Sequence, residues 1–292
     1  MNLRFEQLHP LTTFLFYSGA IALLMLMLHP YYLLAAFFAI LLREYLHDRL
    51  RGVRGWVLFI FLSALIFVMA NPFFNQRGSH VLVEWANRRI TLEALLYGGI
   101  TAFSLMSIVV LFISFNRVMT PNKLLFLFGR VLPQFALLLM LTLRFIPLMK
   151  RRLDDISMVQ HSKGVSVTRG KWSERAKKGL LYVQILLTYS LEEAIQTADS
   201  MKARAFGKGK RSSYAHFRWY SYDTLSVAFI LISLTIMMIG RLVGLGYLTI
   251  YPVMDSLQLV GGDMLLLCLF IFYFLFPLWL EWGGMIKWRI FN

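Results

Sequence analysis

The sequence predicts an all-α integral membrane protein with about six transmembrane helices and additional amphipathic helices on the cytoplasmic side. Three observations predict this fold class. Of the 292 residues, 58% are hydrophobic, far above the share in an ordinary soluble domain. These residues gather in stretches long enough to cross a bilayer. The basic residues are concentrated in the segment between two of those stretches.

The apolar stretches are separate helices, because turn-forming residues lie between them. His29-Pro30 separates the first two, Asn71-Pro72 ends the third, and Pro121 precedes the fifth. A membrane-crossing helix needs about 20 apolar residues, and on that criterion the second and third stretches are short. The candidates are Leu11–Leu28, Tyr31–Leu46, Trp56–Ala70, Ala94–Phe115, Leu132–Met149, Thr224–Leu245 and Met264–Leu280.

The segment from Lys150 to Tyr222 is strongly basic, in a chain whose net charge is +15. The positive-inside rule therefore places this segment in the cytoplasm. Its apolar residues recur at helical spacing, which predicts two amphipathic helices on either side of a loop at Gly164–Gly170. The first set is Ile146, Met149, Leu153 and Ile156, and the second is Leu191, Ala194, Ile195, Ala198, Met201 and Ala205.

The topology depends on whether Leu132–Met149 crosses the membrane. Arg144 lies inside this stretch, and an arginine in a lipid-facing span costs about 3 kcal/mol or more. If the stretch does not cross, most basic residues of the short loops face the cytoplasm. We therefore expect a helix on the cytoplasmic side, six spans and two cytoplasmic termini. The chain then divides into N-terminal transmembrane helices (1–130), a cytoplasmic helical region (131–222) and C-terminal transmembrane helices (223–292).

Sequence patterns typical of catalysis or metal binding do not occur. Cys268 is the single cysteine, so neither an internal disulfide nor a thiolate cluster can form. The six histidines lack metal-ligand spacing, and the glycine-rich stretch 207–213 lacks the spacing of a phosphate-binding loop. We predict no catalytic, cofactor-binding or metal-binding residues, and no ATP hydrolysis by this chain.

Each amphipathic helix ends in a basic residue between two small residues. These triplets are Ser162-Lys163-Gly164 and Ala203-Arg204-Ala205. Small neighbours would allow another protein to approach the cation closely. A second interpretation is equally consistent with the spacing: a basic residue in the last turn complements the helix dipole, and glycine ends the helix.

Several motifs resemble the coupling (T) subunit of energy-coupling factor (ECF) transporters, which are prokaryotic uptake systems for vitamins and metal ions. They are the run Leu141–Pro147, the triplet at Lys163 and the run Ser200–Gly207. Earlier segments are also similar to that family. These are His9–Thr12, Asn71-Pro72 and Ile90–Glu93, so the resemblance covers nearly the whole chain.

The resemblance implies a transmembrane scaffold of an ATP-driven uptake transporter for a vitamin, vitamin precursor or metal ion, in a prokaryotic plasma membrane. In that family two Ala-Arg-Gly motifs dock into two ATPase subunits. The match assigns this role to Ser162, Lys163 and Gly164, and to Ala203, Arg204 and Ala205. Lysine lacks the planar fork of arginine, and alanine tolerates a positive φ poorly, so both triplets depart from the family pattern.

The expected partners are two ABC-type ATP-binding subunits, a substrate-binding membrane (S) subunit and the lipid bilayer. Nucleic acid is not expected, because the basic residues lie beside membrane helices and anionic lipid explains their excess. Two other function classes stay open. A membrane-embedded enzyme would need clustered carboxylates or a nucleophile with its base, and a self-contained permease would need ionisable residues near the bilayer midplane, a description that only Arg144 and Arg241 approach.

Overall fold

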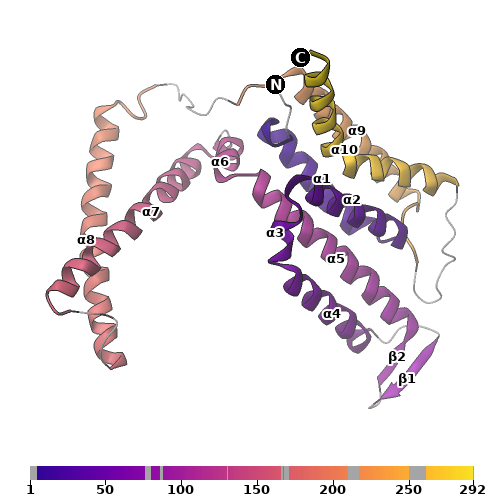
Figure 1. The fold of residues 1–292 in the computed structure, drawn as a ribbon, viewed down its shortest axis with the longest axis horizontal. Helices are drawn as coiled ribbons and strands as arrows, with labels where there is room; N and C mark the ends of the chain where they lie inside the picture. The colour runs from indigo at the N-terminus through magenta and orange to yellow at the C-terminus, as the bar shows by residue number, and fades with distance from the viewer. Residues whose placement is uncertain are drawn as a thin grey trace. The chain divides into compact units, whose positions relative to one another are not determined.

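The computed structural model describes residues 5–75, 80–85, 88–129, 131–165, 167, 171–209, 217–249 and 261–291. These residues are almost entirely helical, which confirms the predicted all-α fold class. The chain forms two compact units, which are traced in Figure 1. Unit 1 contains Met1–Leu124 and Phe217–Asn292, and unit 2 contains Leu125–His216.

Unit 1 consists of long helices with one short hairpin. Its elements are the 3-10 helix η1 (Phe5–Gln7), α1 (Pro10–Leu26), α2 (Pro30–Asp48), α3 (Arg51–Arg54), α4 (Val57–Phe74), the antiparallel strands β1 (Val81–Trp85) and β2 (Arg88–Thr91), α5 (Leu92–Val118), α9 (Ser221–Leu242) and α10 (Gly261–Phe291). The boundary between the units falls within α6 (Pro121–Gly129). Unit 2 contains α7 (Pro133–Ser162) and α8 (Trp172–Ala203).

Polar contacts at one end of unit 1 connect the beginnings of α1 and α9 with the ends of α2 and α5. The backbone N–H of His9 donates to the buried carboxylate of Asp223, at 2.9 Å. Arg43, near the end of α2, donates to the hydroxyls of Tyr17 and Ser114, each at 2.8 Å. We call this end of unit 1, where α1, α4 and α9 begin and α2 and α5 end, the basic end.

The opposite end of unit 1 joins the remaining helix termini. Arg241, near the end of α9, donates to the carbonyl of Leu26 at the end of α1, at 3.0 Å. The Tyr32 hydroxyl, near the start of α2, donates to the carbonyl of Asp263 near the start of α10, at 2.8 Å. The long helices of unit 1 therefore alternate in direction.

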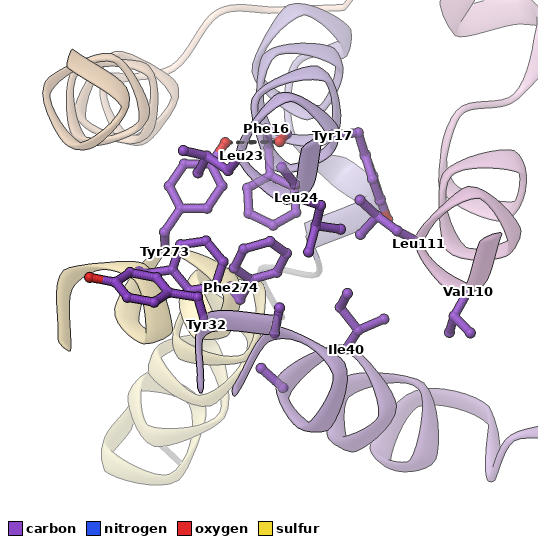
Figure 2. Close-up of a cluster of buried hydrophobic side chains, with 14 of the residues drawn as sticks. Phe16, Tyr17, Leu23, Leu24, Tyr32, Ile40, Val110, Leu111, Tyr273 and Phe274 are labelled. Atoms are coloured by element: carbon purple, nitrogen blue, oxygen red, sulfur yellow. Dashed lines mark hydrogen bonds between the residues drawn. The ribbon is translucent and has the colours of Figure 1, made fainter. Parts of the chain in front are cut away.

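The core of unit 1 is rich in aromatic rings, which Figure 2 shows between α1, α2 and α10. Phe16 and Tyr273 stack with their ring centroids 5.2 Å apart, and the Tyr273 hydroxyl donates to the Phe16 carbonyl at 2.9 Å. Gly19 permits this approach, because a Cβ there would lie 2.5 Å from the Tyr273 hydroxyl. The buried tyrosine thus has its polar atom paired, as buried hydroxyls require.

α4 ends later than the sequence predicted. Asn71-Pro72 was expected to end the helix, which instead continues to Phe74. A proline inside a helix leaves the carbonyl four residues earlier without its N–H partner. That carbonyl belongs to Val68 and lies against Gly98 of α5, where a Cβ would be 3.3 Å from it. Because Pro72 lies in the last turn, the helix loses little by continuing.

Five helices among the described residues are long and apolar enough to cross a membrane, namely α4, α5, α7, α9 and the Gly261–Trp282 part of α10. The protein is therefore a multi-pass membrane protein. The predicted six included the stretches that form α1 and α2. α1 is apolar but has only 17 residues, and α2 carries Arg43, Glu44 and Asp48 near its end. The stretch 132–149 and the first amphipathic helix form one continuous helix, α7.

Candidate functional site

Unit 2 is a pair of crossed helices, α7 and α8 (Figure 1). At the crossing the Arg152 guanidinium is 2.8 Å from the Glu193 carboxylate and lies over the Tyr189 ring, 5.6 Å from its centroid. The Ser190 hydroxyl contacts the Met149 sulfur at 2.9 Å. Charged, aromatic and thioether groups therefore hold the two helices together where they meet.

Two described residues that follow α7, Val165 and Val167, are bonded to side chains of α8. Tyr182, one of the few buried residues of unit 2, donates its hydroxyl to the Val165 carbonyl at 2.7 Å. Arg175 donates through Nε to the Val167 carbonyl at 2.8 Å. These bonds attach the chain just after α7 to the neighbouring helix, so the C-terminal end of α7 has a defined position on α8.

α7 ends in a Schellman motif centred on the first basic triplet. Lys163 is the C-cap, and Gly164 follows with φ +80°. The N–H of Gly164 donates to the His161 carbonyl at 3.0 Å, and the N–H of Val165 donates to the Gln160 carbonyl at 2.9 Å. This pair of bonds satisfies two carbonyls that a helix end otherwise leaves unpaired.

α8 ends in the same motif, although glycine is missing from the left-handed position. Arg204 is the C-cap, and Ala205 adopts φ +58°. The N–H of Ala205 donates to the Lys202 carbonyl at 2.9 Å, and the N–H of Phe206 donates to the Met201 carbonyl at 3.0 Å. The triplets thus present their basic residue from the same backbone geometry, and Ala205 accepts the strain that the sequence predicted.

All six predicted site residues are described and exposed: Ser162, Lys163, Gly164, Ala203, Arg204 and Ala205. Within the described residues, Lys163 and Arg204 form no ion pair. One triplet lies at the C-terminal end of α7 and the other at the C-terminal end of α8. Lys163 also borders an open groove of about 460 Å³ between the helices, lined by Arg152, Asp155, Ile156, Val159, Gln160, Ile185 and Tyr189 as well.

Sequence reasoning located the triplets but missed the contacts that position them. Periodicity indicated the apolar positions of α7, among which Met149 and Ile156 lie at the crossing, whereas Ile146 is 60% exposed. The roles of Tyr182 and Arg152 depend on residues far away in the sequence. An amphipathic pattern shows which side of a helix is apolar, but not which partner covers it.

A comparison with protein families matches the description "cobalt transport protein" (CbiQ) over residues 4–215, more than half of the chain. The chain belongs to this family. It is 27% identical to the energy-coupling factor transporter transmembrane protein EcfT of Staphylococcus aureus over 201 residues, which cover 63% of this chain and 74% of that protein. It is 29% identical to EcfT of Listeria innocua, with 61% and 69% covered.

Membership in this family confirms the resemblance seen in the sequence. The chain is the transmembrane T component of an ECF-type uptake transporter, and it is a subunit of a larger complex. The role of the two triplets, the identity of the partners and the subunit that hydrolyses ATP stay predictions.

Proposed function

We propose that this T component transmits the movement of two ABC-type ATPase subunits to a substrate-binding membrane subunit, through α7 and α8. The observation that carries the proposal is the pair of matched helix ends. Lys163 and Arg204 are both exposed C-cap residues with no ion pair among the described residues, and both extend from Schellman motifs on one crossed pair. Two equivalent basic ends fit two equivalent partners.

The two cations supply the chemistry for docking. Guanidinium and ammonium groups donate strong hydrogen bonds to carboxylates and to carbonyl oxygens in a groove of a partner subunit. Arg204 binds such groups bidentately, whereas Lys163 acts as a compact charge. Acidic surfaces on the ATPase subunits are therefore the expected counterpart.

The contacts between α7 and α8 join the two helices, so that they can move together as one rigid lever. The ion pair from Arg152 to Glu193, and the bond from Tyr182 to Val165, keep the α7 end attached to α8. A force applied at either basic end is then carried by both helices. Because ATP hydrolysis is assigned to the partner subunits, the role proposed for this chain is mechanical.

The substrate-binding subunit is proposed to dock on apolar surface that the chain leaves uncovered. On α8, a stripe at helical spacing is largely exposed: Leu180, Leu187, Leu191 and Ile195 are 68%, 57%, 66% and 63% exposed. Such a stripe is unfavourable in water and is typical of a contact with another membrane subunit or lipid. The transported molecule would then be recognised outside this chain.

We further propose that the basic end of unit 1 faces the cytoplasm. Arg43, Arg49, Arg51, Arg54 and Arg117 all lie there. At the opposite end lie Arg241 and the strand residues Arg88 and Arg89. The positive-inside rule favours the more basic end in the cytoplasm, which would place both chain termini there.

The decisive experiment is affinity purification of the chain from its native membrane in mild detergent, with mass spectrometry of the bound proteins. We expect two nucleotide-binding subunits, or two copies of one, to co-purify with the wild-type chain. Joint replacement Lys163→Glu and Arg204→Glu should remove them, because like charges would then meet the acidic partner surface.

A matched control replaces Lys177→Glu and Lys208→Glu, which change the charge of unit 2 equally at exposed positions outside the triplets. The control should retain the ATPase subunits. If both double variants lose them equally, general electrostatics hold the complex together and the docking role is wrong. If neither loses them, the triplets merely cap their helices.

A further inference from the structure

The turn between α2 and α4 presents three arginines in a row of exposed positions. Arg49, Arg51 and Arg54 are all exposed, whereas Leu50 and Val53 between them pack into the core of unit 1. Residues that pack into the core of unit 1 therefore alternate along this turn with exposed arginines. We call Arg49, Arg51 and Arg54 the arginine turn.

The backbone of the arginine turn is strained. Arg49 and Leu50 adopt φ +49° and +62°, a left-handed conformation that side chains with a Cβ disfavour. Gly52 allows the turn to pack tightly, because a Cβ there would clash with the Arg117 guanidinium. Strain of this kind persists where the surroundings hold it, and it often marks a functional surface.

The two acidic residues near the end of α2, Glu44 and Asp48, already pair with Arg117. Arg117 lies 3.4 Å from the Glu44 carboxylate and 3.3 Å from that of Asp48. No described residue forms an ion pair with Arg49, Arg51 or Arg54. Three positive charges thus stay uncompensated within the described part of the chain, and an anion must come from outside it.

The position of the arginine turn points to the membrane surface. α4, which begins directly after it, is apolar and exposed along its length, with Leu58 78% and Phe61 62% exposed. Tyr45 and Trp56 flank the turn and are 57% and 53% exposed. Aromatic side chains of this kind lie at the level of lipid headgroups, and basic residues beside them meet the headgroup phosphates.

We propose that the arginine turn is a binding site for the headgroups of anionic phospholipids. Guanidinium groups bind phosphate oxygens bidentately. Tyr45 and Trp56 would hold the turn at headgroup depth while the acyl chains of the same lipids cover α4. The site orients unit 1 in the leaflet, separately from the proposed docking of unit 2.

The test uses the full chain in vesicles, with Trp56 as the single fluorophore and the other tryptophans replaced by phenylalanine. Trp56 emission is quenched by brominated phosphatidylglycerol or brominated phosphatidylcholine at equal mole fraction. We expect stronger quenching by phosphatidylglycerol. Joint replacement Arg49→Gln, Arg51→Gln and Arg54→Gln should lower this preference by roughly fivefold per arginine, the factor for one basic residue at an anionic surface.

Three comparisons make the result specific. Arg→Lys at the same three positions keeps the charge and should keep most of the preference, which separates lipid binding from misfolding. Joint replacement Lys171→Gln, Lys177→Gln and Lys178→Gln removes equal charge from unit 2 and should leave Trp56 quenching unchanged. Native mass spectrometry of the chain with all its tryptophans should show fewer retained phosphatidylglycerol molecules only for the Arg→Gln variant.

Equal quenching of the wild-type chain by both lipids would overturn the proposal. So would equal losses in the Arg→Gln and Lys→Gln variants, since general charge would then explain the preference. An Arg→Gln variant that keeps its lipid preference but loses co-purifying proteins would show that the arginine turn contacts a protein instead, and would also overturn it.

Discussion

Ala205 is the residue that most clearly separates the two basic triplets. It holds φ +58° at the position where Gly164 holds φ +80° in the other motif. A Cβ at Gly164 would meet nothing within 4 Å, so only backbone strain distinguishes alanine from glycine there. The sequence correctly predicted that alanine restricts this position, because alanine stands where the family pattern has glycine.

Replacing Ala205→Gly should stabilise the end of α8 by about 0.5–1 kcal/mol, because glycine adopts a positive φ without strain. The measurement is hydrogen exchange of the Phe206 amide, which donates to Met201. The reciprocal change Gly164→Ala should accelerate hydrogen exchange of the Val165 amide, by about the ratio by which Ala205→Gly slows exchange of the Phe206 amide. Unchanged exchange in both variants would show that the helix ends are not limited by backbone strain.

His29, in the turn between α1 and α2, provides a second prediction at this scale. Its side chain is buried, and its Nδ1 has no hydrogen-bond partner among the described residues. Burial lowers the pKa of His29 from its ordinary value, and the Asp263 carboxylate only partly opposes this shift. The unfolded chain therefore binds a proton more readily than the folded chain, at pH values between the lowered pKa and about 6.5.

The free energy of unfolding should consequently fall as the pH drops through this window. Thermal unfolding at pH 7.5 and 5.5 measures the effect, with His29→Asn as the control. The wild-type chain should lose more stability on acidification than the His29→Asn chain, since the other titrating groups are common to both. Identical losses would mean that protonated His29 is tolerated in the folded protein.

At the scale of elements, sequence patterns identified the long helices but not their boundaries or partners. Long apolar runs locate membrane helices well, since lipid permits few alternatives to a helix. Pro72 was predicted to end α4, but the proline lies in the last turn, where Gly98 of another helix accommodates the freed carbonyl. The hairpin β1–β2 lies in a stretch too short and mixed to be recognised.

The exposed stripe of α8 supports a prediction about partners. Leu187→Gln and Leu191→Gln together should release the substrate-binding subunit from the purified complex while the ATPase subunits stay bound, because the basic triplets are unchanged. Quantitative mass spectrometry of the purified complex measures both. Changing Gln184→Ala and Thr188→Ala on the same helix serves as the control. Joint loss of all partners would instead indicate that α8 itself unfolds.

At the scale of the whole molecule, the contacts of unit 1 constrain the topology of α7. α5 ends and α9 begins at the basic end, since Arg43 contacts Ser114 and His9 contacts Asp223. The chain between them must therefore cross the membrane an even number of times. Among the described residues of that connection, α7 alone is long and apolar enough to cross. We infer that α7 stays on one side, as the cost of Arg144 in lipid also favours.

Cysteine labelling of intact cells tests this topology. In a Cys268→Ala background, single replacements Gln7→Cys, Ser173→Cys and Tyr247→Cys place thiols at the basic end, at the start of α8 and at the opposite end of unit 1. A membrane-impermeant maleimide should label only the Tyr247→Cys chain, and permeabilised cells should allow all three to react. Labelling of Ser173→Cys from outside would mean that α7 crosses the membrane. Because the contacts of unit 1 exclude an odd number of crossings, α8 would then have to be the returning span, despite the Arg152–Glu193 pair at its crossing with α7.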